Sequence, residues 1–162
     1  MANRMQKEQI QEFTTKITLS NRTGLTVVTY EILFAYLADA KSVLKVENWE
    51  DYKKAIRQSQ KCIDELIKTL DFTYQLSSEL YQIYMYGKEL LGKALYKRKE
   101  AELTECENLM KMLYDAFVKV AETDHSAPLM RNTEQIYAGY TYGRHDVNVN
   151  SSNMNASRGF FV

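Results

Sequence analysis

The sequence has very few of the residues that interrupt helices. It contains one proline, Pro128, and six glycines, and between Leu25 and Glu122 there is no proline and only Gly87 and Gly92. Proline and glycine are the strongest helix breakers, so their scarcity favours one α-helix after another across this stretch.

An excess of charge and a long apolar run are also missing. Acidic and basic residues balance at 21 each, whereas a nucleic-acid-binding protein usually carries a strong basic patch. No apolar run approaches the roughly 20 residues that span a bilayer, and the polar N-terminus lacks the apolar core of a secretory signal. We therefore expect a protein of the cytosol, with no nucleic-acid partner and no membrane insertion.

Residues that commonly carry catalysis or bind metals are scarce. The only histidines are His125 and His145, and the only cysteines are Cys62 and Cys106. A di-iron bundle needs two Glu-x-x-His motifs, and this chain has one, ending at His125; phosphate-binding and nucleophile-elbow motifs are absent. The cysteines lie far apart on apolar seams, which predicts free, buried thiols. The sequence thus predicts no catalytic residue, no metal site, no cofactor and no enzyme.

Apolar residues recur at alternating steps of three and four, the spacing that places side chains on one face of a helix. We expect helices over residues 5–19, 25–46, 49–70, 76–96 and 100–122. Gly87 is expected to let two helices approach closely. No breaker marks the turn near residues 96–100, but an unbroken helix over 76–122 would be about 70 Å long, too long for a compact domain.

These features predict an all-α protein built as an antiparallel up-and-down four-helix bundle over residues 20–128. Residues 1–19 would form a short N-terminal helix with one apolar stripe, and residues 129–162, rich in Asn, Ser, Gly and Tyr, would form an irregular tail.

The helix expected over residues 25–46 carries more apolar surface than one seam requires. Val27, Ile32, Phe34 and Tyr36 lie outside its seam, and a helix that is apolar nearly all round must be covered by another segment. The twelve tyrosines of the chain also suit a surface that is sometimes wet and sometimes covered.

Several short motifs, taken together in their order and spacing, resemble the FliS family of flagellar export chaperones. They are Thr29-Tyr30-Glu31 followed by Ala40-Lys41, then Leu70-Asp71-Phe72, then Leu80, Ile83, Tyr84 and Tyr86, and finally Leu113, Ala116 and Phe117. The tail elements Tyr140-Thr141-Tyr142-Gly143 and Ser157-Arg158-Gly159-Phe160 are similar to extensions of some Gram-positive members.

The resemblance implies a four-helix bundle that binds the disordered C-terminal segment of flagellin, prevents premature polymerisation and assists export. Other flagellar export or regulatory proteins are further candidate partners. Apolar excess and family motifs together give the expected partner-binding residues: Val27, Tyr30, Glu31, Ile32, Phe34, Tyr36, Leu80, Tyr84 and Phe117. A structural or regulatory bundle that forms homodimers through its extra apolar face is the alternative. For the chaperone, the single apolar stripe of residues 1–19 and their position before the apolar helix predict that this segment covers the groove until the client arrives.

Overall fold

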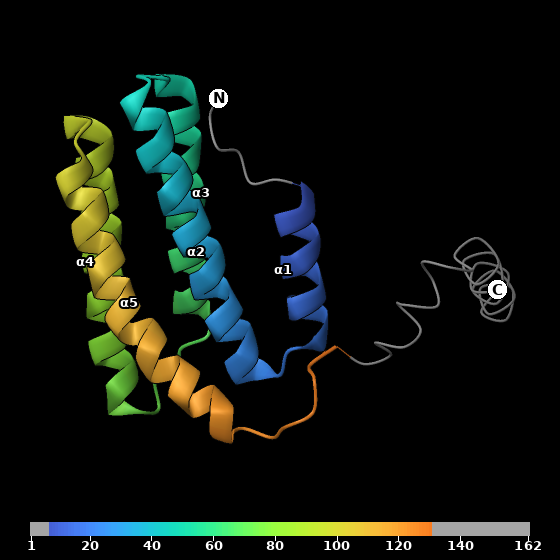
Figure 1. Ribbon diagram of the computed structural model, residues 1–162. Helices are drawn as coiled ribbons and strands as arrows, with labels where there is room; N and C mark the ends of the chain where they lie inside the picture. Colours follow the sequence, from blue (N-terminus) through green and yellow to red (C-terminus); the bar gives the residue numbers. More distant parts are fainter. Residues whose placement is uncertain (1–6, 131–162) are drawn as a thin grey trace, which may run out of the picture.

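The computed structural model describes residues 7–130. Five helices occupy this range: α1 (Lys7–Leu19), α2 (Arg22–Lys45), α3 (Trp49–Lys68), α4 (Gln75–Lys97) and α5 (Glu100–Thr123). Helices α2 to α5 run alternately up and down, and α1 lies beside α2 outside this group (Figure 1). Each of the four packs on two others, because α2 and α4 both contact α3 and α5. The expected all-α bundle is confirmed, while the expected irregular tail lies largely outside the described residues.

Asparagine side chains fix where α2 and α3 begin. The Gly24 amide donates to Asn21 Oδ1 at 2.8 Å, and the Asp51 amide donates to Asn48 Oδ1 at 3.2 Å. Each bond satisfies an amide that the first turn of a helix leaves without an intrahelical partner. The bundle therefore starts its first two helices at positions that the sequence marks by cap residues.

The turn between α4 and α5 forms without glycine or proline. Arg98 ends α4 in the left-handed region, with φ of 53°, and its amide donates to the Ala94 carbonyl at 2.9 Å. Its guanidinium lies 4.3 Å from the centre of the Trp49 ring. A cation over the face of an indole ring is attractive, so a contact with α3 stabilises a backbone conformation that arginine seldom adopts.

Gly87 allows α4 and α5 to pack closely in the middle of the bundle. A Cβ atom at this position would lie 2.3 Å from Cε of Met110 and 3.4 Å from Cδ1 of Ile63. The close approach expected for Gly87 is thus confirmed. Cys62 and Cys106 are free and buried nearby in the core, and burial raises the pKa of each thiol to about 12.

The lower end of the bundle is more open than its upper end. Leu103, Cys106 and Met110 in the first part of α5 are fully buried, but Leu113 and Phe117 are only half-buried and Val120 is exposed. Figure 1 shows the lower part of α5 crossing away from α4 towards the lower end of α2. Apolar side chains near this end therefore keep accessible surface.

Candidate functional site

Four aromatic rings fill the contact between α2 and α5, and we call them the aromatic cluster: Tyr30, Phe34, Tyr114 and Phe117. Tyr30 lies 5.7 Å from Phe117 and 6.3 Å from Tyr114, measured between ring centres, and Phe34 meets Tyr114 edge-on at 5.4 Å. Tyr30 is buried, whereas the other three rings are half-buried. The cluster thus extends from the core to the surface between two helices.

A pair of tyrosine hydroxyls anchors the cluster to α4. The hydroxyl oxygens of Tyr30 and Tyr84 are 2.6 Å apart, and both residues have no exposed surface. Burial raises the pKa of both hydroxyls, so both stay neutral and share one hydrogen bond. Neither residue offers surface to a partner in this conformation.

Helix α1 lies against α2 and is joined to the edge of the aromatic cluster through Glu31. Lys16 Nζ on α1 lies 3.2 Å from Glu31 Oε2, and the Tyr114 hydroxyl donates to Glu31 Oε1 at 3.1 Å. The hydrogen bond to Glu12 raises the pKa of Lys16 most. Burial lowers this pKa and the interaction with Glu31 raises it, so the net pKa is raised and the ammonium stays charged. Glu31 therefore connects α1, α2 and α5.

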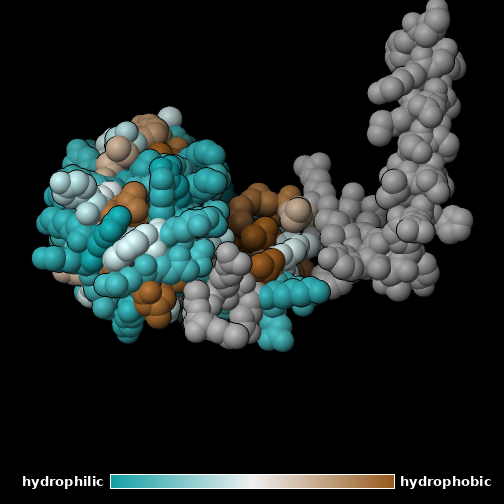
Figure 2. Space-filling view, turned by 90° about the horizontal axis from the view of Figure 1, so that it is seen from above, coloured by the Kyte–Doolittle hydropathy of each residue, from teal (hydrophilic) through white to brown (hydrophobic). Residues whose placement is uncertain are grey.

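Helix α1 buries little of its own apolar surface. Thr18 is its only buried residue, Phe13 and Ile17 are half-buried, and Ile10 is exposed. Figure 2, a view from above, shows hydrophobic atoms gathered in the part of the molecule that lies beside the bundle. The main contact of α1 is with α2. A helix of 13 residues is marginal by itself, so α1 depends on this contact for its stability.

A hydrogen-bond network, which we call the latch, ties the turn before α2 to the segment after α5. Asn21 Nδ2 donates to the Asp124 and Ser126 carbonyls at 3.1 and 3.2 Å, and the Thr23 hydroxyl donates to Asp124 Oδ2 at 2.6 Å. The Leu129 amide donates to the Ser20 carbonyl at 3.1 Å. The turn that positions α1 is therefore bonded to the end of α5.

Hydrogen bonds from Ser126 and Thr23 lower the pKa of Asp124 to about 2. A depressed carboxyl pKa stabilises the folded state above the ordinary value of about 4, and this contribution is lost as the pH falls towards 2. The Asp124 carboxylate is therefore ionised at neutral pH and accepts the hydrogen bonds from Thr23 and Ser126.

Asn21 serves both the α2 cap and the latch, and two substitutions separate these roles. Asn21→Ser keeps a capping hydroxyl but loses the amide donor, whereas Asn21→Ala loses both. We expect Asn21→Ala to lower the free energy of unfolding by about 1 kcal/mol more than Asn21→Ser, since that is the usual worth of a cap. Urea unfolding measures this difference. Hydrogen exchange at the Leu129 amide should accelerate in both variants, and unchanged exchange would show that Asn21 does not hold the latch.

The structure brings together some of the residues expected to bind a partner and separates others. Tyr30, Phe34 and Phe117 share the aromatic cluster, Tyr84 bonds to it, and Glu31 bonds to Tyr114. Val27 lies one turn before Glu31 on the same helix face. Ile32 and Tyr36 lie on another face of α2, and Tyr36 is close enough to Cys62 of α3 to interact electrostatically. The antiparallel register that places Gly87 against Met110 puts Leu80 level with Phe117.

The apolar side chains of α2 that were expected to lie outside its seam are only partly exposed. Val27, Ile32, Phe34 and Tyr36 are all half-buried, because α3, α5 and α1 all pack on this helix. Most of the well-exposed large apolar side chains of the described bundle helices belong instead to α4. The sequence drew attention to the tyrosines among them, but none of these residues was among those expected to bind a partner. They are Leu76, Tyr81, Met85, Tyr86 and Tyr96.

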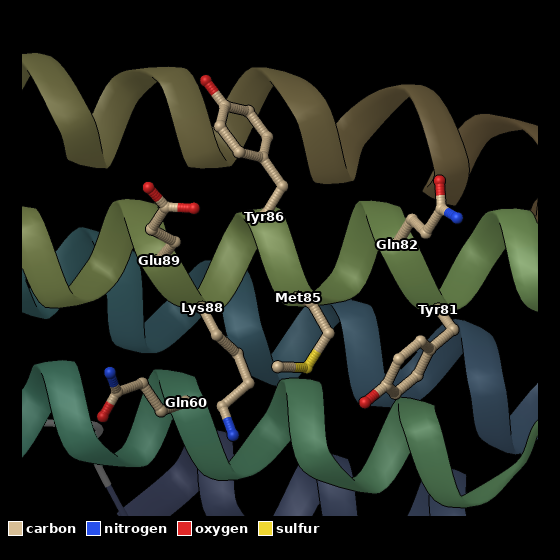
Figure 3. Close-up of a pocket in the computed structure, with 7 residues that line it drawn as sticks. All are labelled: Gln60, Tyr81, Gln82, Met85, Tyr86, Lys88 and Glu89. Atoms are coloured by element: carbon tan, nitrogen blue, oxygen red, sulfur yellow. The ribbon is translucent and has the colours of Figure 1, made fainter.

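Part of this exposed surface of α4 borders a shallow cleft of about 520 Å³. Figure 3 shows Tyr81, Met85 and Lys88 pointing from α4 towards α3, which contributes Gln60 to the lining of the cleft. Lys88 Nζ lies 2.6 Å from Asp64 Oδ1 across the same gap. The spacing of Tyr81, Met85 and Tyr96 along one face of α4 is the signal that could have identified this surface.

Residues 7–130 contain neither a membrane-spanning helix nor a metal-binding cluster. In this range no helix combines the length and hydropathy needed to cross a membrane. Within the same residues no group of three or more His, Cys, Asp or Glu side chains is arranged to hold a metal ion.

Comparison with known families identifies the chain. No curated protein matches it. A family model described as "Flagellar protein FliS" matches residues 2–124, which include all five helices. The match extends through α1, beyond the region near residues 20–122 where the motifs lie. The chain therefore belongs to the FliS family of flagellar export chaperones.

Proposed function

We propose that this protein binds the disordered C-terminal segment of flagellin in the cytosol and holds it until export. The observation that carries this proposal is the half-buried aromatic cluster on the α2–α5 face, with the weakly packed α1 beside it. The client would lie as an amphipathic helix along this face, a common way to recognise a segment that folds on binding.

The packing of α1 supports a face that opens for the client. Helix α1 is joined to the edge of the cluster by the Lys16–Glu31 ion pair, and its side chains at this contact are mostly half-buried. An ion pair that is partly exposed contributes little stability. Displacing α1 would expose more of the α2 face near Val27 and Phe34, and the apolar stripe of flagellin would replace it.

The size of such an interface suits a chaperone that must release its client. Folding of a disordered segment on binding buries roughly 1,000–3,000 Å², but ordering the segment costs several kcal/mol. The net affinity is therefore moderate. While bound, the apolar stripe of flagellin is unavailable to other flagellin chains, which blocks polymerisation before export.

Titration calorimetry with a synthetic peptide of the flagellin C-terminal segment tests the proposal. We expect a one-to-one complex with the wild-type protein and at least tenfold weaker binding for Phe34→Glu, because a carboxylate at this half-buried position is costly to desolvate. Met112→Glu is the matched control, since Met112 is exposed on the outer side of α5 and should bind as the wild type does.

Two results would contradict the proposal. One is a wild-type protein that does not bind the peptide, and the other is an equal effect of both glutamate substitutions when circular dichroism shows both variants folded. Sedimentation of the free protein addresses the homodimer alternative, which requires a stable dimer that ignores flagellin.

A further inference from the structure

Helix α1 keeps an apolar surface that α2 does not fully cover. Ile10, Phe13 and Ile17 follow steps of three and four, so they share one face of the helix. We call these three residues the α1 stripe. Ile10 is 52% exposed, and Phe13 and Ile17 are half-buried. The α1 stripe therefore has room for a further segment with apolar or aromatic side chains.

The chain returns to this helix after α5. The Leu129 amide donates to the Ser20 carbonyl at 3.1 Å, and the Asn21 side chain makes two further bonds to the segment that precedes Leu129. Ser20 directly follows α1, so the latch brings the end of the described chain to the C-terminal end of α1. Leu129 and Met130 are 54% and 44% exposed there. The residues after Met130 therefore start beside α1.

The sequence that follows carries apolar and aromatic residues at alternate positions. Ile136, Ala138, Tyr140 and Tyr142 are separated by steps of two. Side chains two residues apart point to the same side of an extended chain. Tyr137 falls on the opposite side. An extended segment over residues 136–142 would thus have one apolar side that can lie on a helix while the other side faces water.

The length of the chain between these points fits such a contact. From Ser20 back to Ile10, α1 rises about 15 Å at 1.5 Å per residue. Ten residues, as from Met130 to Tyr140, span at most about 33–36 Å when extended, so residues 136–142 can reach the whole α1 stripe. A segment on so short a tether has an effective concentration of roughly millimolar order. A few apolar contacts are therefore enough to hold it.

We infer that residues 136–142 fold back on α1 and cover the α1 stripe. The contact holds α1 against α2, because a helix of 13 residues is marginal without packing partners. It supports α1 in addition to the latch and to the ion pair with Glu31. The contact lies within one chain and does not depend on flagellin. Together with the proposed function, it sets how easily α1 leaves the α2–α5 face.

Hydrogen exchange in the full-length protein tests the contact. Tyr140→Ser removes a ring from the apolar side and should accelerate exchange of the α1 amides about threefold, since an aromatic contact with Phe13 is lost. Tyr137→Ser makes the same change on the opposite side and should leave the exchange unchanged. Equal effects of the two substitutions, or no effect of Tyr140→Ser, would overturn the inference.

A double-mutant cycle identifies the partner of residues 136–142. Ile10→Ser should also accelerate exchange in α1, and combining it with Tyr140→Ser should accelerate it less than the product of the two single effects, because both remove the same contact. Leu76→Ser is the control, since Leu76 is exposed on α4 and its effect should be independent of Tyr140→Ser. Effects of Ile10→Ser and Tyr140→Ser that simply multiply would contradict the contact.

Photocrosslinking separates an intramolecular contact from other occupants of the α1 stripe. With p-benzoylphenylalanine at position 140, we expect a cross-link to residues 7–19 of the same chain, which keeps the mass of the monomer. A cross-link to a second copy of the chain, or to α3 or α4, would overturn the inference.

The outcomes distinguish this inference from the proposed function. If the cross-link and the exchange effects appear but the wild type does not bind the flagellin C-terminal peptide, the contact stands and the proposed function is wrong. If the peptide binds and Phe34→Glu weakens binding, but Tyr140→Ser leaves exchange in α1 unchanged, the proposed function stands and the contact is wrong.

Discussion

Replacing Tyr84 with phenylalanine should lower the free energy of unfolding by about 1–3 kcal/mol. The two hydroxyls of Tyr30 and Tyr84 share a hydrogen bond of 2.6 Å and have no exposed surface. Removing one of them leaves the other buried without a partner, which is costly, whereas removing both replaces a polar pair by two apolar rings. The double variant Tyr30→Phe/Tyr84→Phe should therefore be less destabilised than the sum of the single variants. Urea unfolding measures all three.

Tyr86 provides a control on the same helix. Its hydroxyl donates to Glu105 Oε1 at 2.6 Å, but at an exposed position, so water replaces the lost bond and Tyr86→Phe should change stability by less than about 0.5 kcal/mol. A Tyr84→Phe variant as stable as Tyr86→Phe, or single effects that simply add, would refute the account of the buried pair.

Deleting residues 1–19 should tighten the binding of the flagellin C-terminal peptide. If α1 covers the α2–α5 face about 90% of the time, the apparent affinity is reduced about tenfold, and the deletion restores that factor. Helix α1 shares its main contact with α2 alone, so the remaining four helices keep the contacts they make with one another. Calorimetry of the truncated and full-length proteins gives the ratio.

A single substitution tests the same idea without truncation. Lys16→Glu places a carboxylate beside Glu31 and should also tighten binding, though less than the deletion does. Lys7→Glu makes the same charge change at an exposed position of α1 and should leave affinity unchanged. Unchanged or weaker peptide binding after the deletion would mean that α1 does not compete with the client.

Much of the fold follows from local chemistry that the sequence displays. Asn48 caps α3, and the Ser59 hydroxyl donates to the Ala55 carbonyl of its own helix at 2.9 Å. Three–four spacing of apolar residues located the helices to within a few residues of their observed ends, except at the break between α4 and α5, which was expected only because an unbroken helix would be too long. These features depend on residues close together in the chain, which is why a single sequence reveals them.

Features that depend on distant contacts were harder to predict. The turn at Arg98 is stabilised by Trp49 of another helix, and nothing in the local sequence marks it. The divergence of α5 from α4 leaves Leu113 and Phe117 half-buried, although they continue the same apolar seam as Met110. Periodicity shows which face of a helix is apolar, but not over what length the neighbouring helix stays packed against that face.

The candidate site shows the same limit. The family motif centred on Tyr30 and the one that contains Tyr84 suggested partner contacts, yet these two residues bond to each other inside the core. Residues of one helix can be sorted by face from the sequence, but which face stays uncovered depends on where the other helices lie. That is why the apolar surface of α2 is largely covered while that of α4 is not.

The order of the helices gives the α2–α5 face a topological role. Three of the four contacts in the bundle, α2 with α3, α3 with α4 and α4 with α5, join consecutive helices, and only the contact between α2 and α5 joins the first helix to the last. It is the contact that closes the ring of four helices. Separating α2 from α5 would break no hairpin, because each of the other three contacts joins two consecutive helices.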